Sequence, residues 1–315
     1  MNNKQLDVIL TIVIANYNYG RFLEGAIRSI VQQCDAPVSR DDRVALPIKG
    51  TSARAVELIV CDAASTDNSL EIIGRYKNYL AWWCSEPDSG QSEAFNKGFK
   101  QGRGRYLTWL NADEQYLCGT FLALFTIMIR KKTPPWITGN YIEFYTDSNI
   151  IRRISWGPHF QPKFLVGRKR GGAAVYGPST FIRRDVFEKI GPIDERLHYT
   201  MDLDYWTRMN LAGISQTRLN RFCWAFGVHP QSKSTGFWAQ PENTLKSPGH
   251  RENVEREQKY DYHYKYNFSN PWYCVWFFFR ILDGSLFVRA WKKITLPGRR
   301  YDLDTCGIVC GWKRK

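Results

Sequence analysis

The feature of this sequence that most restricts its fold is an alternation of short apolar runs and amphipathic stretches in the first half of the chain. Val8–Ile14 is β-branched and nearly continuously apolar, which is typical of a strand buried on both faces. Phe22–Val31 carries its apolar residues at helical spacing, and two further strands are predicted at Glu57–Cys61 and Ala81–Cys84. Strands separated by helices indicate βαβ units, and therefore an α/β fold with a mostly parallel sheet flanked by helices.

An acidic cluster follows the predicted strand Arg105–Leu110. Asn111, Asp113 and Glu114 come directly after this strand and before an apolar segment, Tyr116–Ile129. Because ligands of open α/β sheets bind beyond the carboxyl ends of the strands, these oxygens are expected to face a site. Hard oxygen ligands suit Mg²⁺ or Mn²⁺, the ions that accompany diphosphate groups. Taken alone, the cluster is also explained by an acidic turn in solvent.

Polar residues also follow the first and second predicted strands. Asn16, Tyr17 and Tyr19 come after the first strand, and the tyrosine rings are able to stack on a nucleobase or a sugar. Asp62 ends the second strand, where its carboxylate can accept a hydrogen bond from a base N–H or a ribose hydroxyl. The residues Ser65–Asp67 are better explained as caps of the next helix, predicted through Leu70–Tyr76.

The sequence pattern in the middle of the chain allows fewer predictions. Cys34–Val56 has no clear period and is interpreted as a loop insertion. Trp136–Ile154 is strand-rich, Ala173–Ile182 predicts a strand, and Asp202–Ala212 predicts a helix. The basic loop Val166–Gly172 either reaches a phosphate through Arg168, Lys169 and Arg170 or is simply solvated.

Taken in order, these motifs resemble the family 2 nucleotide-sugar glycosyltransferases. The resemblance covers about Val8 to Ser234. It is carried by Thr11–Asn18, Asp62–Asp67, Ser89–Gly98, Trp109–Glu114, Asp194–Asp204 and His229–Ser234. It implies a GT-A-type, Rossmann-like mixed and mostly parallel sheet in residues 1–235, with a nucleotide-binding half to about residue 115 and an acceptor half at 116–235. Residues 236–315 then form an aromatic-rich helical C-terminal extension.

The resemblance also implies a metal-dependent inverting hexosyltransferase with Mn²⁺ or Mg²⁺ as cofactor. The positions it assigns to the donor are Ala15, Asn16, Tyr17, Asp62, Gln91, Lys97, Asn111 and Ala112. It assigns Asp113, Glu114 and His229 to the metal, Asp202 to the catalytic base, and Ser179 and Asp204 to the acceptor side. Asn111 departs from the family's acidic motif, and its weaker amide oxygen favours a ribose or water-mediated contact.

These residue types suit the chemistry of sugar transfer. Inversion needs a carboxylate to take the proton of the acceptor hydroxyl, which we assign to Asp202. It also needs a cation at the diphosphate, which gains charge as the bond breaks. Ser232–Ser234 is placed to close over that group. Simpler explanations remain for Asp202, as an acid favoured by the helix dipole, and for Lys97, as a solvated charge.

Charge and composition bear on the partners. The donor is taken by default to be a UDP-sugar, and the acceptor to be a glycan or lipid-linked hydroxyl in polysaccharide or cell-surface glycan synthesis. The formal charge of +14 invites an anionic partner. Trp272–Arg280 is densely aromatic and has basic residues nearby, namely Arg289, Lys292, Lys293, Arg299 and Arg300. This segment either lies on an anionic membrane surface or packs on the catalytic domain or in a dimer.

Other classes of protein fit less well. No nucleic-acid-binding signature occurs, and no GxGxxG follows the first strand, which disfavours a dinucleotide oxidoreductase. A degenerate transferase gains support from Asn111, whereas Asp113, Asp202 and His229 argue for turnover. The eight cysteines include no CxxC, and the sequence has neither a secretory signal nor an apolar run of about 18 residues. We therefore expect a cytoplasmic protein with reduced thiols, peripheral to the inner face of the membrane if it binds lipid.

Overall fold

The computed structural model describes residues 7–40, 43–51, 54–157, 177–233, 248–261, 271–302 and 307–308. The strands of the main sheet are β1 (Asp7–Asn16), β2 (Val38–Arg40), β3 (Arg43–Pro47), β4 (Arg54–Asp62), β5 (Trp82–Ser85), β6 (Tyr106–Asn111), β7 (Glu114–Tyr116), β8 (Trp136–Tyr145), β9 (Ile151–Ser155), β10 (Thr180–Arg183) and β11 (Gln216–Val228). The helices are α1 (Gly20–Val31), α2 (Ser69–Tyr76), α3 (Gln91–Gln101), α4 (Thr120–Arg130), α5 (Arg184–Ile190), α6 (Met201–Leu211), α8 (Pro248–Tyr260), α9 (Pro271–Leu282) and α10 (Ser285–Thr295). Short 3₁₀ turns lie at η1 (Lys77–Tyr79) and η3 (Gly177–Ser179), and a separate ribbon pairs β12 (Tyr301–Asp302) with β13 (Gly307–Ile308).

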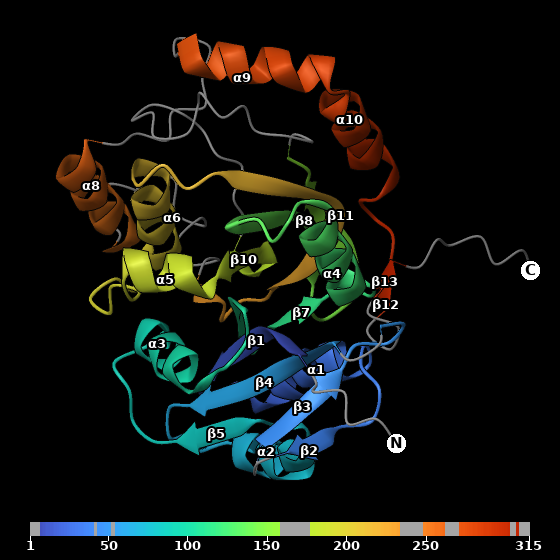
Figure 1. Ribbon diagram of the computed structural model, residues 1–315, viewed down its shortest axis with the longest axis vertical. Helices are drawn as coiled ribbons and strands as arrows, with labels where there is room; N and C mark the ends of the chain where they lie inside the picture. Colours follow the sequence, from blue (N-terminus) through green and yellow to red (C-terminus); the bar gives the residue numbers. More distant parts are fainter. Residues whose placement is uncertain are drawn as a thin grey trace, which may run out of the picture.

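One mixed sheet runs through the described residues in the order β2-β3-β4-β1-β6-β10-β8-β11-β7, with β5 beside β4 and β9 beside β8 (Figure 1). The strands β5, β4, β1 and β6 are parallel, because β1 pairs with β4 on one side and with β6 on the other, and β5 pairs with β4. In its second half, β10 runs antiparallel to both β6 and β8, while β11 is parallel to β8 and antiparallel to β7. The mixed, mostly parallel sheet predicted from the sequence is therefore confirmed.

The core lies on both faces of this sheet, because successive residues of a strand point to opposite sides. Ile12 and Ile14 of β1 face α1, α2 and α4, whereas Val13 between them faces α3, α5 and α6. These central residues are fully buried. The β-branched run at the start of the chain thus becomes the middle of a three-layer α/β/α arrangement.

The stretch Cys34–Val56, interpreted as a loop insertion, is in part a β-hairpin, so this prediction was wrong. β2 pairs with β3, and β3 extends the main sheet antiparallel to β4, with Leu46 opposite Val56. Leu46 and Ile48 are buried. The apolar run is too short, and too closely flanked by charged residues, to produce a recognisable period.

The apolar segment Tyr116–Ile129 begins with the last residue of β7, Tyr116, and forms the helix α4 from Thr120 onwards. It buries Phe121, Leu124 and Met128, while Ile129 remains 63% exposed, so it packs by one face only. The strands predicted in Trp136–Ile154 correspond to β8 and β9, and the strand predicted in Ala173–Ile182 is confirmed for its last residues, in β10.

The helices α9 and α10 lie at one end of the molecule (Figure 1). α8 packs beside α6, and α9 continues into α10 after a turn at Gly284, which has a φ of +71°. Ile151 at the start of β9 exchanges backbone hydrogen bonds with Gly298 and Arg299, which fixes the end of α10 to the sheet. Among the described helices, none has the length and apolar character needed to span a membrane.

Candidate active site

Three strands end together at one edge of the sheet. The register of the parallel strands puts Asn16 of β1 beside Asp62 of β4, and Ala15 of β1 beside Asn111 of β6. Four positions that the sequence assigned to the donor are therefore neighbours, as expected for the carboxyl ends of parallel strands. The β6–β7 turn places Asp113 at the same edge.

Asp62 is buried at this edge and is 1% exposed. One carboxylate oxygen accepts a hydrogen bond from Asn16 Nδ2 at 2.7 Å, and the other accepts from Ser65 N at 3.0 Å and from Ser85 Oγ at 2.6 Å. Asp62 therefore ties the ends of β1, β4 and β5 together. Contact of Asp62 with a base or ribose stays a prediction. Such a contact would be made by a carboxylate that already accepts these three hydrogen bonds.

Asn16 and Tyr17 present different groups at the edge. Asn16 is 3% exposed, and its Oδ1 has no hydrogen-bond partner among the described residues. Tyr17 is 62% exposed, so its ring is available to a planar group. Ala64, on the neighbouring loop, holds a φ of +56°, a left-handed conformation that is unfavourable for a residue with a Cβ. Such strained positions cluster at binding sites.

The cap predicted for α2 is observed in a modified form. Asp67 accepts hydrogen bonds from the backbone N–H of Ser69, at the start of α2, and from that of Gly20, at the start of α1. One carboxylate therefore serves the first turns of two helices, which are otherwise without acceptors. This arrangement confirms the capping role predicted for Asp67.

Asp113 and His229 form the most chemically distinctive pair at the edge. Asp113 Oδ2 lies 3.0 Å from His229 Nε2, and their side chains are only 9% and 3% exposed. The pair joins the β6–β7 turn to the residue that follows β11. Gly227 permits this approach, because a Cβ there would lie 2.3 Å from the backbone oxygen of Asp113.

The imidazole of His229 is held in place by aromatic residues. Phe22 lies 4.6 Å from it and Tyr19 lies 5.5 Å from it, measured between ring centroids. Tyr19 OH also donates to the backbone oxygen of Gln231 at 3.0 Å. His229 Nδ1 is buried and has no hydrogen-bond partner among the described residues.

The carboxylate of Glu114 is buried within the β6–β7 turn. It is 2% exposed, and Oε2 accepts a hydrogen bond from the backbone N–H of Asn111 at 3.0 Å, which closes the turn between β6 and β7. Burial, followed by the negative charges of Asp113 and Asp202, raises the pKa of Glu114 well above its usual range. Its assignment as a metal ligand stays a prediction.

The described residues contain no ready-made metal site, since nowhere among them do three His, Cys, Asp or Glu side chains come together. A Mg²⁺ or Mn²⁺ ion that accompanies a diphosphate does not require one. Such an ion is usually held by one or two carboxylates, while substrate phosphates and water complete its shell. Asp113 and His229 fit this requirement, because they offer an oxygen and a nitrogen ligand side by side.

Asp202 is the second residue of α6 and is partly buried. Its Oδ1 accepts a hydrogen bond from the backbone N–H of Leu203 at 2.7 Å. Burial raises the pKa of Asp202 to about 6, although this N–H and the positive charge of Arg256 act in the opposite direction. Its charge also acts on Glu114, so Asp202 belongs to the same electrostatic environment as the β6–β7 turn.

α3 and α6 are joined through the loop that precedes Asp202. Asn96 on α3 exchanges two side-chain hydrogen bonds with the backbone of Ile193, at 2.8 and 2.9 Å. Ser92 Oγ donates to the backbone oxygen of Leu197 at 3.0 Å. The motif that begins with Ser89-Gly90-Gln91 therefore positions the segment leading to α6, and Gln91 is the first residue of α3.

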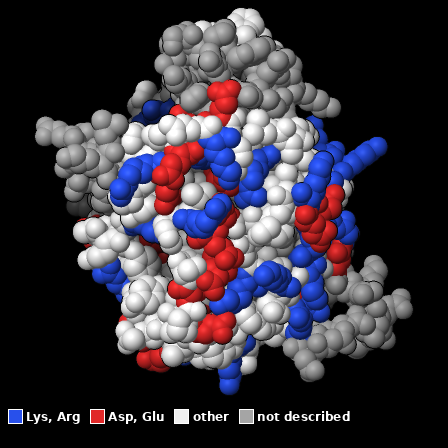
Figure 2. All heavy atoms as spheres, turned by 90° about the vertical axis from the view of Figure 1, so that its left-hand side faces the viewer, with Lys and Arg blue, Asp and Glu red and all other residues white. Residues whose placement is uncertain are grey.

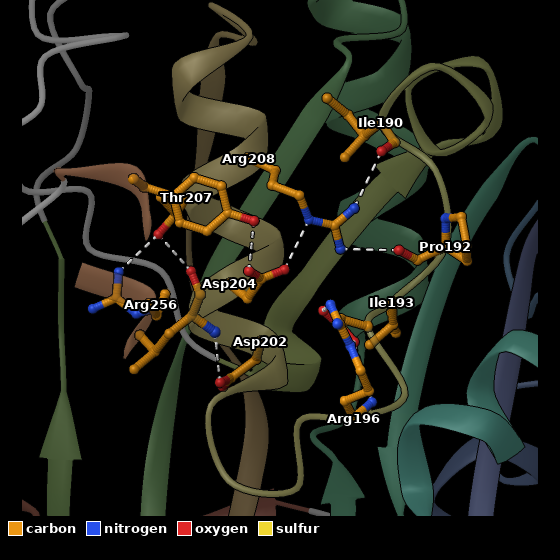
Figure 3. A network of polar contacts seen from close by, with 12 residues as sticks. Ile190, Pro192, Ile193, Arg196, Asp202, Asp204, Thr207, Arg208 and Arg256 are labelled. Carbon is orange, nitrogen blue, oxygen red and sulfur yellow. Dashed lines mark hydrogen bonds and ion pairs between the residues drawn. The ribbon is translucent and has the colours of Figure 1, made fainter. Parts of the chain in front are cut away.

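α8 holds the other side of α6 by three polar side chains at helical spacing. The carboxylate of Glu252 accepts hydrogen bonds from the backbone N–H groups of His198, Tyr199 and Thr200, at 3.0, 2.8 and 3.0 Å. Arg256 donates to Thr207 Oγ1 at 3.0 Å, as Figure 3 shows. Glu252 and Arg256 were not predicted from the sequence, because they belong to none of its motifs.

Tyr260 completes this contact by donating to Asp204 Oδ1 at 2.8 Å. Asp204 is 1% exposed, and its other oxygen accepts from Arg208 Nε at 2.8 Å. Arg208 in turn donates to the backbone oxygens of Ile190 and Pro192 (Figure 3). Asp204 thus has a structural network around it, and its acceptor-side role stays a prediction.

The other predicted positions are placed as follows. Lys97 Nζ lies 2.7 Å from Glu86, which raises the pKa of Lys97, so its charge is compensated within the chain. Ser179 is fully buried, and Ala112 is 1% exposed. Lys233 Nζ donates to the backbone oxygen of His198 at 2.8 Å, which links the segment after His229 to the loop before α6. Arg168, Lys169, Arg170 and Ser234 lie outside the described residues.

Comparisons with known proteins agree with this arrangement. The model of glycosyl transferase family 2 matches residues 11–191. An uncharacterized glycosyltransferase of Nostoc sp. is 25% identical over 191 residues, which are 59% of this chain and 54% of that protein. The PGL/p-HBAD biosynthesis glycosyltransferase of Mycobacterium tuberculosis is 26% identical over 152 residues, 47% of this chain and 56% of that protein. The chain thus spans little more than half the length of these two relatives.

The fold has solved counterparts. The crystal structure of S. aureus TarS 1–349 in complex with UDP-GlcNAc has a TM-score of 0.53 at 12% identity, covering 80% of this chain and 73% of that one. The GT-A-type fold predicted from the sequence is confirmed by this likeness and by the sheet itself. Because the family model extends over more than half of the chain, the protein belongs to glycosyl transferase family 2.

Proposed function

We propose that this protein is a metal-dependent, inverting glycosyltransferase that moves a sugar from a nucleotide-sugar to a hydroxyl group. The observation that carries the proposal is the Asp113–His229 pair at the carboxyl edge of the sheet, in the same electrostatic environment as Asp202. One part of the site suits a cation and a diphosphate, and the other suits a proton acceptor. Sugar transfer with inversion needs both.

The donor end of the site is assigned to the edge formed by β1, β4 and β6. Asn16 offers a buried amide oxygen without a partner in the described structure, and Tyr17 offers an exposed ring. These groups suit the nucleoside, by hydrogen bonding and by stacking. A UDP-sugar remains the default donor, supported by the UDP-GlcNAc named for the TarS structure.

Asp113 and His229 would hold a Mn²⁺ or Mg²⁺ ion against the diphosphate. When bound, the ion would offset the negative charge that gathers on the leaving group as the glycosidic bond breaks. The chain contributes rigidity to this arrangement, because Phe22 and Tyr19 fix the imidazole and Gly227 keeps β11 close to the turn. Rigid placement of charged groups is the largest source of such stabilisation.

Asp202 is assigned the role of general base. With a pKa of about 6 it is ionised near neutral pH, yet it is a stronger base than an ordinary carboxylate. It would take the proton of the acceptor hydroxyl as that oxygen attacks the anomeric carbon from the face opposite the diphosphate. Residues 1–235 form the catalytic domain in this proposal, while residues 236–315 contribute α8, which supports α6.

The acceptor is assigned to the class of glycans or lipid-linked glycans of polysaccharide and cell-surface synthesis. A second function, nucleotide binding without turnover, is favoured by Asn111, which replaces an acidic ligand of the motif. The two functions differ in one measurement. A transferase hydrolyses its nucleotide-sugar slowly in the absence of an acceptor, whereas a binding protein leaves it intact.

The test uses two variants that remove different parts of the site. Asp113→Asn should abolish metal-dependent binding of the nucleotide and hydrolysis of the nucleotide-sugar together. Asp202→Asn should bind the nucleotide normally and lower turnover about 10²–10⁴-fold. Glu71→Gln, an exposed acid in the first turn of α2, is the matched control and should change neither. Equal turnover in wild type and Asp202→Asn would remove Asp202 from the mechanism.

A further inference from the structure

Two consecutive helices, α9 and α10, expose large apolar side chains on their outer sides. On α9, Phe278, Ile281 and Leu282 are 56%, 43% and 64% exposed. On α10, Phe287, Trp291 and Ile294 are 69%, 69% and 79% exposed. The spacing of three and four residues places each set on one side of its helix. We call these six side chains the outer apolar face.

The opposite side of α10 is already occupied by the protein. Val288 and Leu296 pack against a buried cluster that includes Trp156. Lys292 Nζ lies 4.8 Å from the centre of the Trp156 ring and 5.2 Å from that of Phe222. The helix is therefore docked by one face, and its outer apolar face is not needed for packing within the described residues.

The segment that carries the outer apolar face is basic. Residues 271–302 contain six basic and two acidic residues, and one of the acids, Asp283, accepts from the backbone N–H of Ser285. Lys293 is exposed and makes no salt bridge with the described part of the chain, whereas Nε of Arg289 is buried and faces the protein. The charge of Arg289, followed by burial and the charges of Arg153 and Arg280, lowers the pKa of Lys293.

The charges on another side of the molecule are arranged differently. The side on the left of Figure 1 shows acidic and basic side chains interleaved (Figure 2). In α6 and the loop before it, Arg196 lies 2.7 Å from Asp194, and Arg208 lies 2.8 Å from Asp204. Such charges compensate each other within the chain. Lys293 on α10 has no acidic partner of this kind among the described residues.

We propose that the α9–α10 pair binds the surface of an anionic lipid bilayer, with the outer apolar face in the headgroup layer and Lys293 at the lipid phosphates. Exposed aromatic side chains on a helix with basic flanks have the chemistry of an interfacial helix. Charge favours this partner over a second copy of the chain, because two copies of this basic face would repel each other. The inference does not depend on the sugar-transfer reaction.

The test is sedimentation of the full chain with vesicles of phosphatidylcholine alone and of phosphatidylcholine with about one-third phosphatidylglycerol. Binding is expected only to the anionic vesicles and should weaken as salt is raised. The triple change Phe287→Ser, Trp291→Ser and Ile294→Ser should lower binding more than tenfold. The matched control is Leu122→Ser with Ile129→Ser, which removes exposed apolar side chains from α4 and should have no effect.

The charge contribution is tested separately. Lys293→Ala should weaken binding to anionic vesicles about fivefold, since one cation near such a surface contributes a factor of about five. Lys100→Ala with Lys189→Ala, two exposed cations on α3 and α5, should leave it unchanged. Circular dichroism and nucleotide binding of each variant report whether the fold is retained.

Three results would overturn the proposal. The first is equal binding to neutral and anionic vesicles, or no binding to either. The second is a dimer, detected by light scattering, that dissociates in the triple variant. The third is binding of nucleic acid that is lost with the same substitutions while vesicle binding is unaffected.

Discussion

The substitution Asp202→Asn is predicted to make the protein more stable at alkaline pH while it removes the proposed base. Burial raises the pKa of this carboxyl from 3.8 to about 6. Each pKa unit corresponds to about 1.4 kcal/mol, so the ionised side chain costs the folded state about 3 kcal/mol relative to the unfolded chain. An amide has no such cost, and its oxygen can still accept from the backbone N–H of Leu203.

The pH dependence follows from the direction of the shift. Because the folded pKa is the higher one, the stability associated with this group is fully present below the unfolded pKa near 3.8 and is lost as pH rises through about 6. The difference in free energy of unfolding between Asp202→Asn and wild type should therefore grow across this window and stay constant above it. At pH 8 it should reach about 1–3 kcal/mol, or several degrees in Tm.

The assay is thermal unfolding of wild type and variant at pH 4.5 and pH 8. Asp185→Asn is the matched control, because Asp185 is also an acid in the first turn of a helix, but hydrogen bonding from Arg183 lowers its pKa. Its loss should lower Tm at pH 8, in the opposite direction. A lower Tm of Asp202→Asn at pH 8 would show that Asp202 serves the helix dipole, which contributes about 0.3–1 kcal/mol, and would refute the reasoning.

Three further substitutions test other parts of the site. Gly227→Ala should drive β11 away from the backbone of Asp113, destabilise the protein by about 1–3 kcal/mol in calorimetry and weaken metal-dependent nucleotide binding. The control Gly74→Ala, at a position with open space around it, should instead stabilise the protein by about 0.5–1 kcal/mol. Glu252→Gln should reduce turnover while nucleotide affinity is retained, because the loop before α6 would donate weaker hydrogen bonds to an amide and would hold Asp202 less firmly. Turnover equal to that of the wild type would contradict this. Asp62→Asn should lower the free energy of unfolding by about 1–3 kcal/mol in urea, since an amide nitrogen cannot accept the hydrogen bonds that one oxygen now accepts, and unchanged stability would exclude its role as a tie between strands.

Much of the fold could be predicted because its signals are local. The run Val8–Ile14 is apolar at every position except Thr11, and Phe22–Val31 repeats at helical spacing, so each element is specified within a dozen residues. The β2–β3 hairpin was missed for the opposite reason. The strand β3 is stabilised by its pairing with β4, where Leu46 lies opposite Val56, and this pairing exists only in the folded protein.

The site divides in the same way. The sequence placed Asn16, Asp62 and Asn111 at strand ends, and the parallel register makes them neighbours. It could not show that Asp62 would be surrounded by hydroxyl and amide donors, because Ser85 reaches it only through the pairing of β5 with β4. Glu252 was invisible for a similar reason, since its contacts with the loop before α6 span more than fifty residues and belong to no motif.

The central claim is that Asp113 and His229 bind a nucleoside diphosphate through a divalent cation. The most direct measurement is the thermal shift of the wild-type protein with UDP, GDP, dTDP and CDP, each with and without Mn²⁺, repeated on Asp113→Asn. We expect one nucleotide to raise Tm only when Mn²⁺ is present, and we expect this rise in Tm to be absent in Asp113→Asn. Stabilisation that is the same without metal, or that persists in Asp113→Asn, would contradict it.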